Sequence, residues 1–260
     1  MSIIEFKVNG LFEDNKISNK IYEIINNKKI IEIGGPSLHN YWIPIFYDIS
    51  SEIDILNYSD ENNISLNFGC GLNNKTLNNK CNFIRTNNTE EYILQNLNKY
   101  DVLVTSHVLE HQANPLKQLL LWKKLLKPNG FMIHVLPEKE HTSDKLRKIT
   151  NFDKILLKFK NNVQEDDISE IDELIDCTCH LHLYDKTIIL TENEINYNRN
   201  LLQYYKNNKD IVAKSNPLHQ HVYDFDLLDK ISNFIEMKQI LFFNIYIDNW
   251  VFWSNDNTRN

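Results

Sequence analysis

Short apolar runs alternate with segments of helical spacing along the first half of the chain. Residues 29–33 and 101–106 predict buried strands, and so do residues 131–136. Isoleucines at 17, 21, 24 and 25 predict one face of a helix over 17–28, and leucine spacing predicts another helix over 115–127. Strands that alternate with helices imply right-handed βαβ crossovers, so we expect an α/β fold with a doubly wound, mostly parallel sheet.

The remaining pattern predicts how this sheet is completed. Weaker signals predict a second strand ending around 53–55, a third strand at 81–84, a helix at 89–98 and a turn at 128–130. From 138 to 220 the rhythm breaks into polar helices and acidic runs, which we interpret as a substrate-binding cap inserted into a single domain of residues 1–260. A helix at 222–237 and consecutive strands at 240–247 and 250–253 then predict a C-terminal antiparallel hairpin that closes a seven-stranded sheet.

Composition narrows the partners. A net charge of −7 and a pI of about 5.7 argue against a nucleic-acid partner, because such a protein neutralises phosphates with a basic surface. Four cysteines and the lack of a signal-peptide pattern at the start favour the cytoplasm. No apolar run reaches the roughly 18 residues of a membrane span. The oligomeric state stays open.

A glycine pair follows the first predicted strand, where the segment reads Glu32-Ile-Gly34-Gly35-Pro36-Ser37. Parallel sheets bind ligands beyond the carboxyl ends of their strands, and glycine lets the backbone approach a ligand closely. The segment lacks both the G-x-G-x-x-G pattern and the P-loop Gly-Lys-Ser/Thr. Gly69 and Gly71 form a competing loop, but too few residues separate it from the strand at 101 for two further strand–helix units.

These motifs together resemble class I S-adenosylmethionine-dependent methyltransferases. The resemblance is carried, in order and spacing, by residues 32–37, 100–111, 114–116, 126–130 and 136–137. Residues 162–173 and 218–224 resemble a narrower branch that is encoded with glycosyltransferases in surface-polysaccharide gene clusters. The resemblance implies S-adenosyl-L-methionine as cofactor.

Carried over residue by residue, the resemblance also implies a cofactor site. Around the methionine part of the cofactor it places Glu32, Gly34, Gly35, Pro36 and Ser37. Asp54, expected after strand two, would accept hydrogen bonds from the ribose, and Ser106 and His107 at the end of the fourth strand would border the sulfonium. The acidic residue that the family has after strand three is missing here, and Asn87 is the candidate for an adenine contact.

His107, Glu110 and His111 have the i, i+3, i+4 spacing of one helical face. The pattern is similar to the metal-binding E-x-x-E-H of small-RNA 2′-O-methyltransferases and ubiquinone-type O-methyltransferases, with His107 in place of the first Glu. That similarity implies a divalent metal (Mn, Fe, Zn or Mg) that chelates the acceptor oxygen, and two imidazoles with a carboxylate suit a transition metal better than Mg.

His219 and His221 are candidates for a fourth metal ligand, His219 first, or for the general base. The alternatives are that Glu110 and His111 only hold the helix and loop, as in metal-free relatives, and that His219 and His221 are solvated surface histidines.

Three further features have structural interpretations. Cys177 and Cys179 lack the second cysteine pair of a zinc finger, and the acidic residues 165–173 predict a solvated helix face. Trp250 and Trp253 are expected in the core.

The resemblance and the His/Glu cluster together predict an O-methyltransferase for a hydroxyl of a small acceptor. The resemblance alone implies that this acceptor is a sugar or nucleotide-activated precursor of surface (capsular) polysaccharide. The alternatives are N-, C- or O-methylation of another small metabolite or a phosphorylated capsule precursor, and a catalytically silent binding protein. The glycine loop and the His/Glu cluster argue against the silent protein, since a binding module needs neither.

Overall fold

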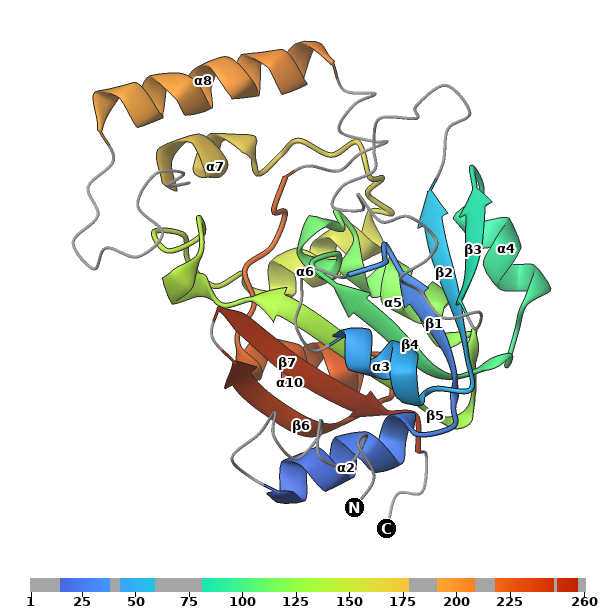
Figure 1. The fold of residues 1–260 in the computed structure, drawn as a ribbon. Coiled ribbons are helices and arrows are strands. Elements are labelled where there is room, and N and C mark those ends of the chain that lie inside the picture. Colours follow the sequence, from blue (N-terminus) through green and yellow to red (C-terminus); the bar gives the residue numbers. More distant parts are fainter. Residues whose placement is uncertain are drawn as a thin grey trace. The chain divides into compact units, whose positions relative to one another are not determined.

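The computed structural model describes residues 15–37, 43–58, 81–177, 191–208, 218–245 and 247–256, which contain a seven-stranded sheet flanked by helices (Figure 1). The strands are β1 (Lys29–Ile33), β2 (Glu52–Tyr58), β3 (Cys81–Thr86), β4 (Tyr100–Ser106), β5 (Leu126–Pro137), β6 (Lys238–Ile245) and β7 (Asp248–Ser254). The α-helices are α2 (Asn15–Ile25), α3 (Ile43–Ile49), α4 (Thr89–Gln95), α5 (Pro115–Lys123), α6 (Phe152–Lys160), α7 (Ile171–Cys177), α8 (Glu192–Asn207) and α10 (Phe225–Phe234). Two 3-10 helices are η1 (Leu109–His111) and η2 (Lys139–His141).

The strand order β3-β2-β1-β4-β5-β7-β6 has its switch point between β1 and β4. The chain proceeds from β1 through β2 to β3 at one edge, then returns to β4 on the other side of β1. β1 pairs in parallel with both neighbours, so Ile33 stands opposite Leu56 and Thr105. The residues that follow β1 and β4 therefore lie at the edge where doubly wound sheets bind ligands. The predicted fold class, with its C-terminal antiparallel hairpin, is confirmed.

The chain divides into two compact units, which we describe separately. Unit 1 consists of residues 1–106, 121–133 and 254–260, and unit 2 of residues 107–120 and 134–253. In unit 1, the apolar face of α2 is buried through Ile21, Ile24 and Ile25, as its spacing predicted. In unit 2, α7 and α8 lie side by side (Figure 1), with Leu174 and Leu202 in one apolar cluster. The single domain and the substrate-binding cap at 138–220 stay predictions.

Most predicted elements are present, with three differences. β2 ends at Tyr58 and not around 53–55, and α3 was not predicted. The predicted turn at 128–130 lies inside β5. A side chain at Gly130 would be crowded there, since a Cβ would lie 3.0 Å from Lys127 O and 3.1 Å from Asp101 O. Trp250 and Trp253 are buried in the core, as expected.

Within the described ranges, every helix is too short or too polar to traverse a lipid bilayer.

Candidate functional site

The loop after β1 opens with Gly34, which has a positive φ of 82° and an exposed surface. Its N–H donates to Leu56 O at 2.9 Å, which fixes the loop to the end of β2. A side chain is disfavoured at this φ, so glycine is the natural residue. The backbone at Gly34 is therefore exposed at the switch point of the sheet.

The side chain of Glu32 contacts this loop from its buried side. Its buried carboxyl group accepts from Ser37 N–H at 3.0 Å and from the Tyr47 hydroxyl. Burial raises the pKa of Glu32 despite these hydrogen bonds. A Cβ on Gly35 would lie 2.2 Å from the Glu32 carboxyl carbon, so only glycine leaves room for the group. Glu32 therefore faces the interior of its own loop, where Pro36 (after a cis peptide bond) and Ser37 are also buried.

Asn57 is a residue of this site that the sequence did not indicate. It lies near the carboxyl end of β2, and its Nδ2 donates to the Gly35 carbonyl at 2.5 Å. The sequence pattern predicts that β2 ends around 53–55, and Asn57 lies beyond that predicted end.

Asp54 is inside β2, not after it, and that part of the prediction is wrong. Its Oδ2 accepts from the Tyr100 hydroxyl at 2.6 Å and lies 3.1 Å from Lys99 Nζ, while its Oδ1 accepts from Asn82 at 2.9 Å. Burial alone would raise the pKa of Asp54, but these hydrogen bonds and the lysine charge lower it. The two carboxylate oxygens of Asp54 thus connect β2 to Asn82, Lys99 and Tyr100 within unit 1.

Ser106 and Asn87 end their strands at the sheet edge that carries Gly34. The Ser106 Oγ is buried, and among the described residues it has no hydrogen-bond partner. Such an orphaned hydroxyl is rare unless a ligand or water completes it. Asn87 directly follows β3 and is exposed, and its predicted adenine contact stays a prediction.

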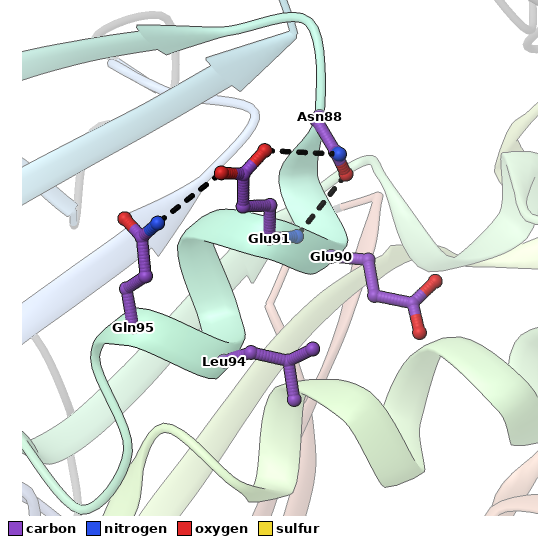
Figure 2. A pocket seen from close by; sticks show the side chains of 5 residues that line it. All are labelled: Asn88, Glu90, Glu91, Leu94 and Gln95. Carbon is purple, nitrogen blue, oxygen red and sulfur yellow. Dashed lines mark hydrogen bonds between the residues drawn. The ribbon is translucent and has the colours of Figure 1, made fainter.

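A hollow of about 470 Å³ lies on the surface of α4 (Figure 2). Glu91 accepts from Asn88 and Gln95 at 3.2 Å each, and the Asn88 side chain caps the helix by accepting from Glu91 N. Its polar side chains are thus largely occupied by each other. None of the predicted site residues lines this hollow, and we assign it no chemistry.

The histidine-rich segment begins unit 2, but it is not the predicted α-helix. His107 has a positive φ of 53°, and only residues 109–111 form a 3-10 turn. Its side chain nevertheless approaches Glu110, with 3.4 Å between His107 Nδ1 and Glu110 Oε1. A histidine in the left-handed region is uncommon and marks a strained, over-determined position.

Glu110, His111 and His219 form the group whose donor atoms converge. One potential ligand atom from each lies within 4.8 Å of the others. Glu110 is fully buried, and neither carboxylate oxygen has a hydrogen-bond partner among the described residues. The rings of His111 and His219 meet edge to face at 4.7 Å. A buried carboxylate with two imidazoles is a donor set suited to a divalent transition metal.

Each histidine of this group has its Nδ1 occupied. His111 Nδ1 lies 3.1 Å from the Leu218 carbonyl, which only accepts, so this nitrogen carries the proton. His219 Nδ1 lies 2.5 Å from Asp144 Oδ2. Both Nε2 atoms therefore keep a lone pair in the neutral tautomer, which is the arrangement of metal-binding histidines.

His107 is bound differently. Its Nε2 lies 3.1 Å from Asp248 Oδ1, so the ring stands between two carboxylates. Burial would lower the pKa of His107, but Asp248 and Glu110 raise it to about 10. Burial would likewise raise the pKa of Glu110, and the surrounding imidazoles lower it. His107 is thus held as an imidazolium and lies outside the converging group, unlike its predicted place as a metal ligand.

His221 also lies outside the group. Its ring is buried, with Nε2 3.4 Å from the Ala113 carbonyl. Burial lowers the pKa of His221 to about 3, with Lys158 adding to the effect. The neutral ring is a weak base inside the core, and this favours His219 over His221 for chemistry.

The segment around His219 is bound to the 3-10 turn through its backbone. Gln220 N–H donates to the Glu110 carbonyl at 2.7 Å and His221 N–H at 3.2 Å, while the Tyr223 hydroxyl donates to Leu109 O at 3.2 Å. Residues more than 100 positions apart are thereby fixed side by side.

The acidic run 165–173 is not the solvated helix face that the sequence predicted. Glu165 accepts from Ala113 N–H at 2.8 Å, and Asp167 and Glu170 pair with the buried Lys158 at 2.7 and 3.4 Å. Glu165 thus binds the run to the segment after the 3-10 turn, while Asp167 and Glu170 bind it to Lys158 of α6. Gly69, Gly71 and Cys179 lie outside the described residues.

The chain is similar to known proteins in sequence and in fold. Residues 24–167 match the model of a family described as a methyltransferase domain. A search of curated proteins finds no match. Similar solved structures include a SAM-dependent methyltransferase from Aquifex aeolicus (TM-score 0.49, 10% identity, covering 96% of this chain and 97% of that one). Another is a 1,6-didemethyltoxoflavin-N1-methyltransferase from Burkholderia thailandensis (TM-score 0.48, 6% identity, 98% and 79%).

Replacing Gly35 tests the loop. Gly35→Ala should weaken S-adenosylmethionine binding at least tenfold, about 1.4 kcal/mol, because the new Cβ displaces the Glu32 carboxyl group. Calorimetric titration measures this. Tyr47→Phe is the milder comparison, since it removes the hydroxyl's hydrogen bonds with Glu32 and Ser37 without a clash. Equal affinity of Gly35→Ala and wild type would refute the role of this loop.

Replacing Asp54 separates a structural from a ribose-binding role. Asp54→Ala should lower the free energy of unfolding by about 2 kcal/mol at pH 7, because the buried Tyr100 hydroxyl and the Asn82 amide lose their acceptor. Since the folded-state pKa is lowered, this stabilisation is present above the unfolded pKa of about 3.9 and is lost as the pH falls through the folded value.

Urea unfolding at pH 7 and pH 3 checks both statements, with exposed Glu90→Ala expected within about 0.5 kcal/mol of wild type. If Asp54→Ala leaves the free energy of unfolding unchanged but binds S-adenosylmethionine tenfold more weakly, Asp54 binds the ribose after all.

Proposed function

Because the chain belongs to the methyltransferase domain family, we propose that this S-adenosylmethionine-dependent enzyme methylates a hydroxyl oxygen of a small acceptor. The acceptor is a sugar or sugar nucleotide of surface-polysaccharide synthesis, a class supported by the resemblance of residues 162–173 and 218–224. The observation that carries the choice of oxygen is the convergence of Glu110, His111 and His219. Nitrogen and carbon acceptors have no need of a group that ionises a hydroxyl.

The cofactor is assigned to unit 1. The residues proposed to hold it are those of the loop Gly34–Ser37, with Ser106 and, for adenine, Asn87. The exposed backbone of Gly34 and the orphaned Ser106 hydroxyl fit a ligand at this edge. When bound, S-adenosylmethionine supplies an electrophilic methyl group on a sulfonium sulfur. Glu32 and Asn57 act on the loop itself, through Ser37 and the Gly35 carbonyl.

The acceptor hydroxyl is assigned to the group in unit 2. Its buried Glu110 carboxylate and the two Nε2 lone pairs fit a divalent cation of the Zn, Fe or Mn type better than Mg. When bound, such an ion lowers the pKa of a coordinated hydroxyl, as it does for water. Three protein ligands are the number found in catalytic sites, where a position stays open for substrate. Glu110 would supply a negative charge to hold the cation, and His107 Nδ1 lies 3.4 Å from Glu110 Oε1.

Metal removal tests this assignment. After chelation, verified by elemental analysis, methyl transfer from labelled S-adenosylmethionine to nucleotide sugars should fall at least tenfold, since the hydroxyl is no longer acidified. Adding back Zn²⁺, Fe²⁺ or Mn²⁺ should restore it better than Mg²⁺ does. His111→Ala should mimic chelation, whereas His141→Ala, at an exposed histidine paired with Glu138, should not.

Full activity of the metal-free enzyme would exclude the metal and leave His219, backed by Asp144, as the general base. Methyl transfer exclusively to nitrogen or carbon in the products, read by mass spectrometry, would contradict the oxygen acceptor.

A further inference from the structure

In unit 2, His219, Asp144 and Arg147 each contact the other two. Asp144 Oδ2 lies 2.5 Å from His219 Nδ1, and Asp144 Oδ1 accepts from Arg147 NH1 at 2.8 Å. The same guanidinium nitrogen donates to the backbone carbonyl of His219 at 2.8 Å. The carboxylate thus holds the ring while the arginine holds both the carboxylate and the histidine backbone.

The burial of this set makes it unlike an ordinary surface ion pair. The side chains of Asp144 and Arg147 are 3% and 1% exposed. Burying such a pair is a poor way to gain stability, because desolvation offsets the attraction. By contrast, the contact between His141 and Glu138, at 2.6 Å, leaves the histidine side chain 51% exposed. The Asp144–His219 contact, at 2.5 Å, thus has a buried carboxylate, whereas the contact of similar length at His141 lies in solvent.

We infer that Asp144 is the positioning residue of the site: it fixes His219 with the proton on Nδ1 and thereby leaves the lone pair of Nε2 available to the group with Glu110 and His111. The inference rests on the proposed function in treating His219 as a metal ligand. Metal binds only an unprotonated ring nitrogen, so the choice of tautomer decides whether His219 is a ligand. The Leu218 carbonyl holds His111 in the same tautomer, so both rings carry the proton on Nδ1 and the lone pair on Nε2.

Arg147 gives the arrangement its direction. A guanidinium only donates, so the Asp144 oxygen that faces it must accept. In Asp144→Asn the amide oxygen would turn to Arg147 and the NH₂ group to His219 Nδ1. Two donors cannot face each other, so the histidine proton moves to Nε2 and the metal-binding lone pair is lost. A change of almost no volume would disable the site, whereas Asp144→Glu keeps an accepting carboxylate.

The test titrates Co²⁺ alone into metal-free wild type and variants, followed by visible absorption, and reads the His219 tautomer by ¹⁵N NMR. Asp144→Asn should weaken Co²⁺ binding 10–100-fold, the usual effect of removing such a partner. Its His219 spectrum should show the proton on Nε2, identified against His219→Ala. Asp144→Glu should keep the proton on Nδ1, and Glu138→Gln should bind Co²⁺ within about threefold of wild type. S-adenosylmethionine affinity reports that each variant is folded.

A merely structural Asp144 predicts the opposite ranking, with isosteric Asn above the longer Glu. Wild-type Co²⁺ affinity in Asp144→Asn, or a proton that stays on Nδ1 there, overturns the inference. If wild type binds no Co²⁺, the metal in the proposed function fails, and the tautomer comparison alone decides the role of Asp144.

Discussion

The buried carboxylate of Glu110 is the constraint on which unit 2 depends. An uncompensated charge in the interior is strongly unfavourable, so the surrounding structure must supply opposite charge or hydrogen-bond donors. Here the ionised form is favoured by imidazole rings, chiefly that of His107, which itself is held in a left-handed conformation beside Asp248. The backbone of Glu110 is also engaged, since its carbonyl accepts from residues 220 and 221. Side chain and main chain of one residue thus organise both segments of the site.

Glu32 in unit 1 shows how the same side chain acquires another character. It too is buried, and its hydrogen-bond donors among the described residues are the Tyr47 hydroxyl and the Ser37 amide. The pKa of Glu32 is therefore raised where that of Glu110 is lowered, with burial opposing the neighbours in both cases. Glu32 determines the shape of a glycine loop through its hydrogen bonds, whereas the lowered pKa of Glu110 favours the charged form that can bind a cation.

The connection between the sites and the fold is made by polar networks in otherwise apolar surroundings. Asp54 joins β2 to Asn82 of β3 and Tyr100 of β4, and Lys158 forms an ion pair with Asp167 of the acidic run 165–173. Such networks are favourable only when every member is satisfied, and they then specify one arrangement of the chain. In this protein they position the segments that carry the chemistry.

The sequence by itself determined the order of strands and helices, the glycine loop after β1 and the candidate pair Glu110 and His111, because these depend on local periodicity and spacing. It misplaced the end of β2, and with it Asn57, because a strand's end depends on pairing with β1 and β3. Tertiary structure alone decided that His107 is an imidazolium, that His221 is core and that His219 joins the group. The physical reason is distance along the chain: Asp144, which orients His219, is 75 residues away, and no local pattern encodes such a contact.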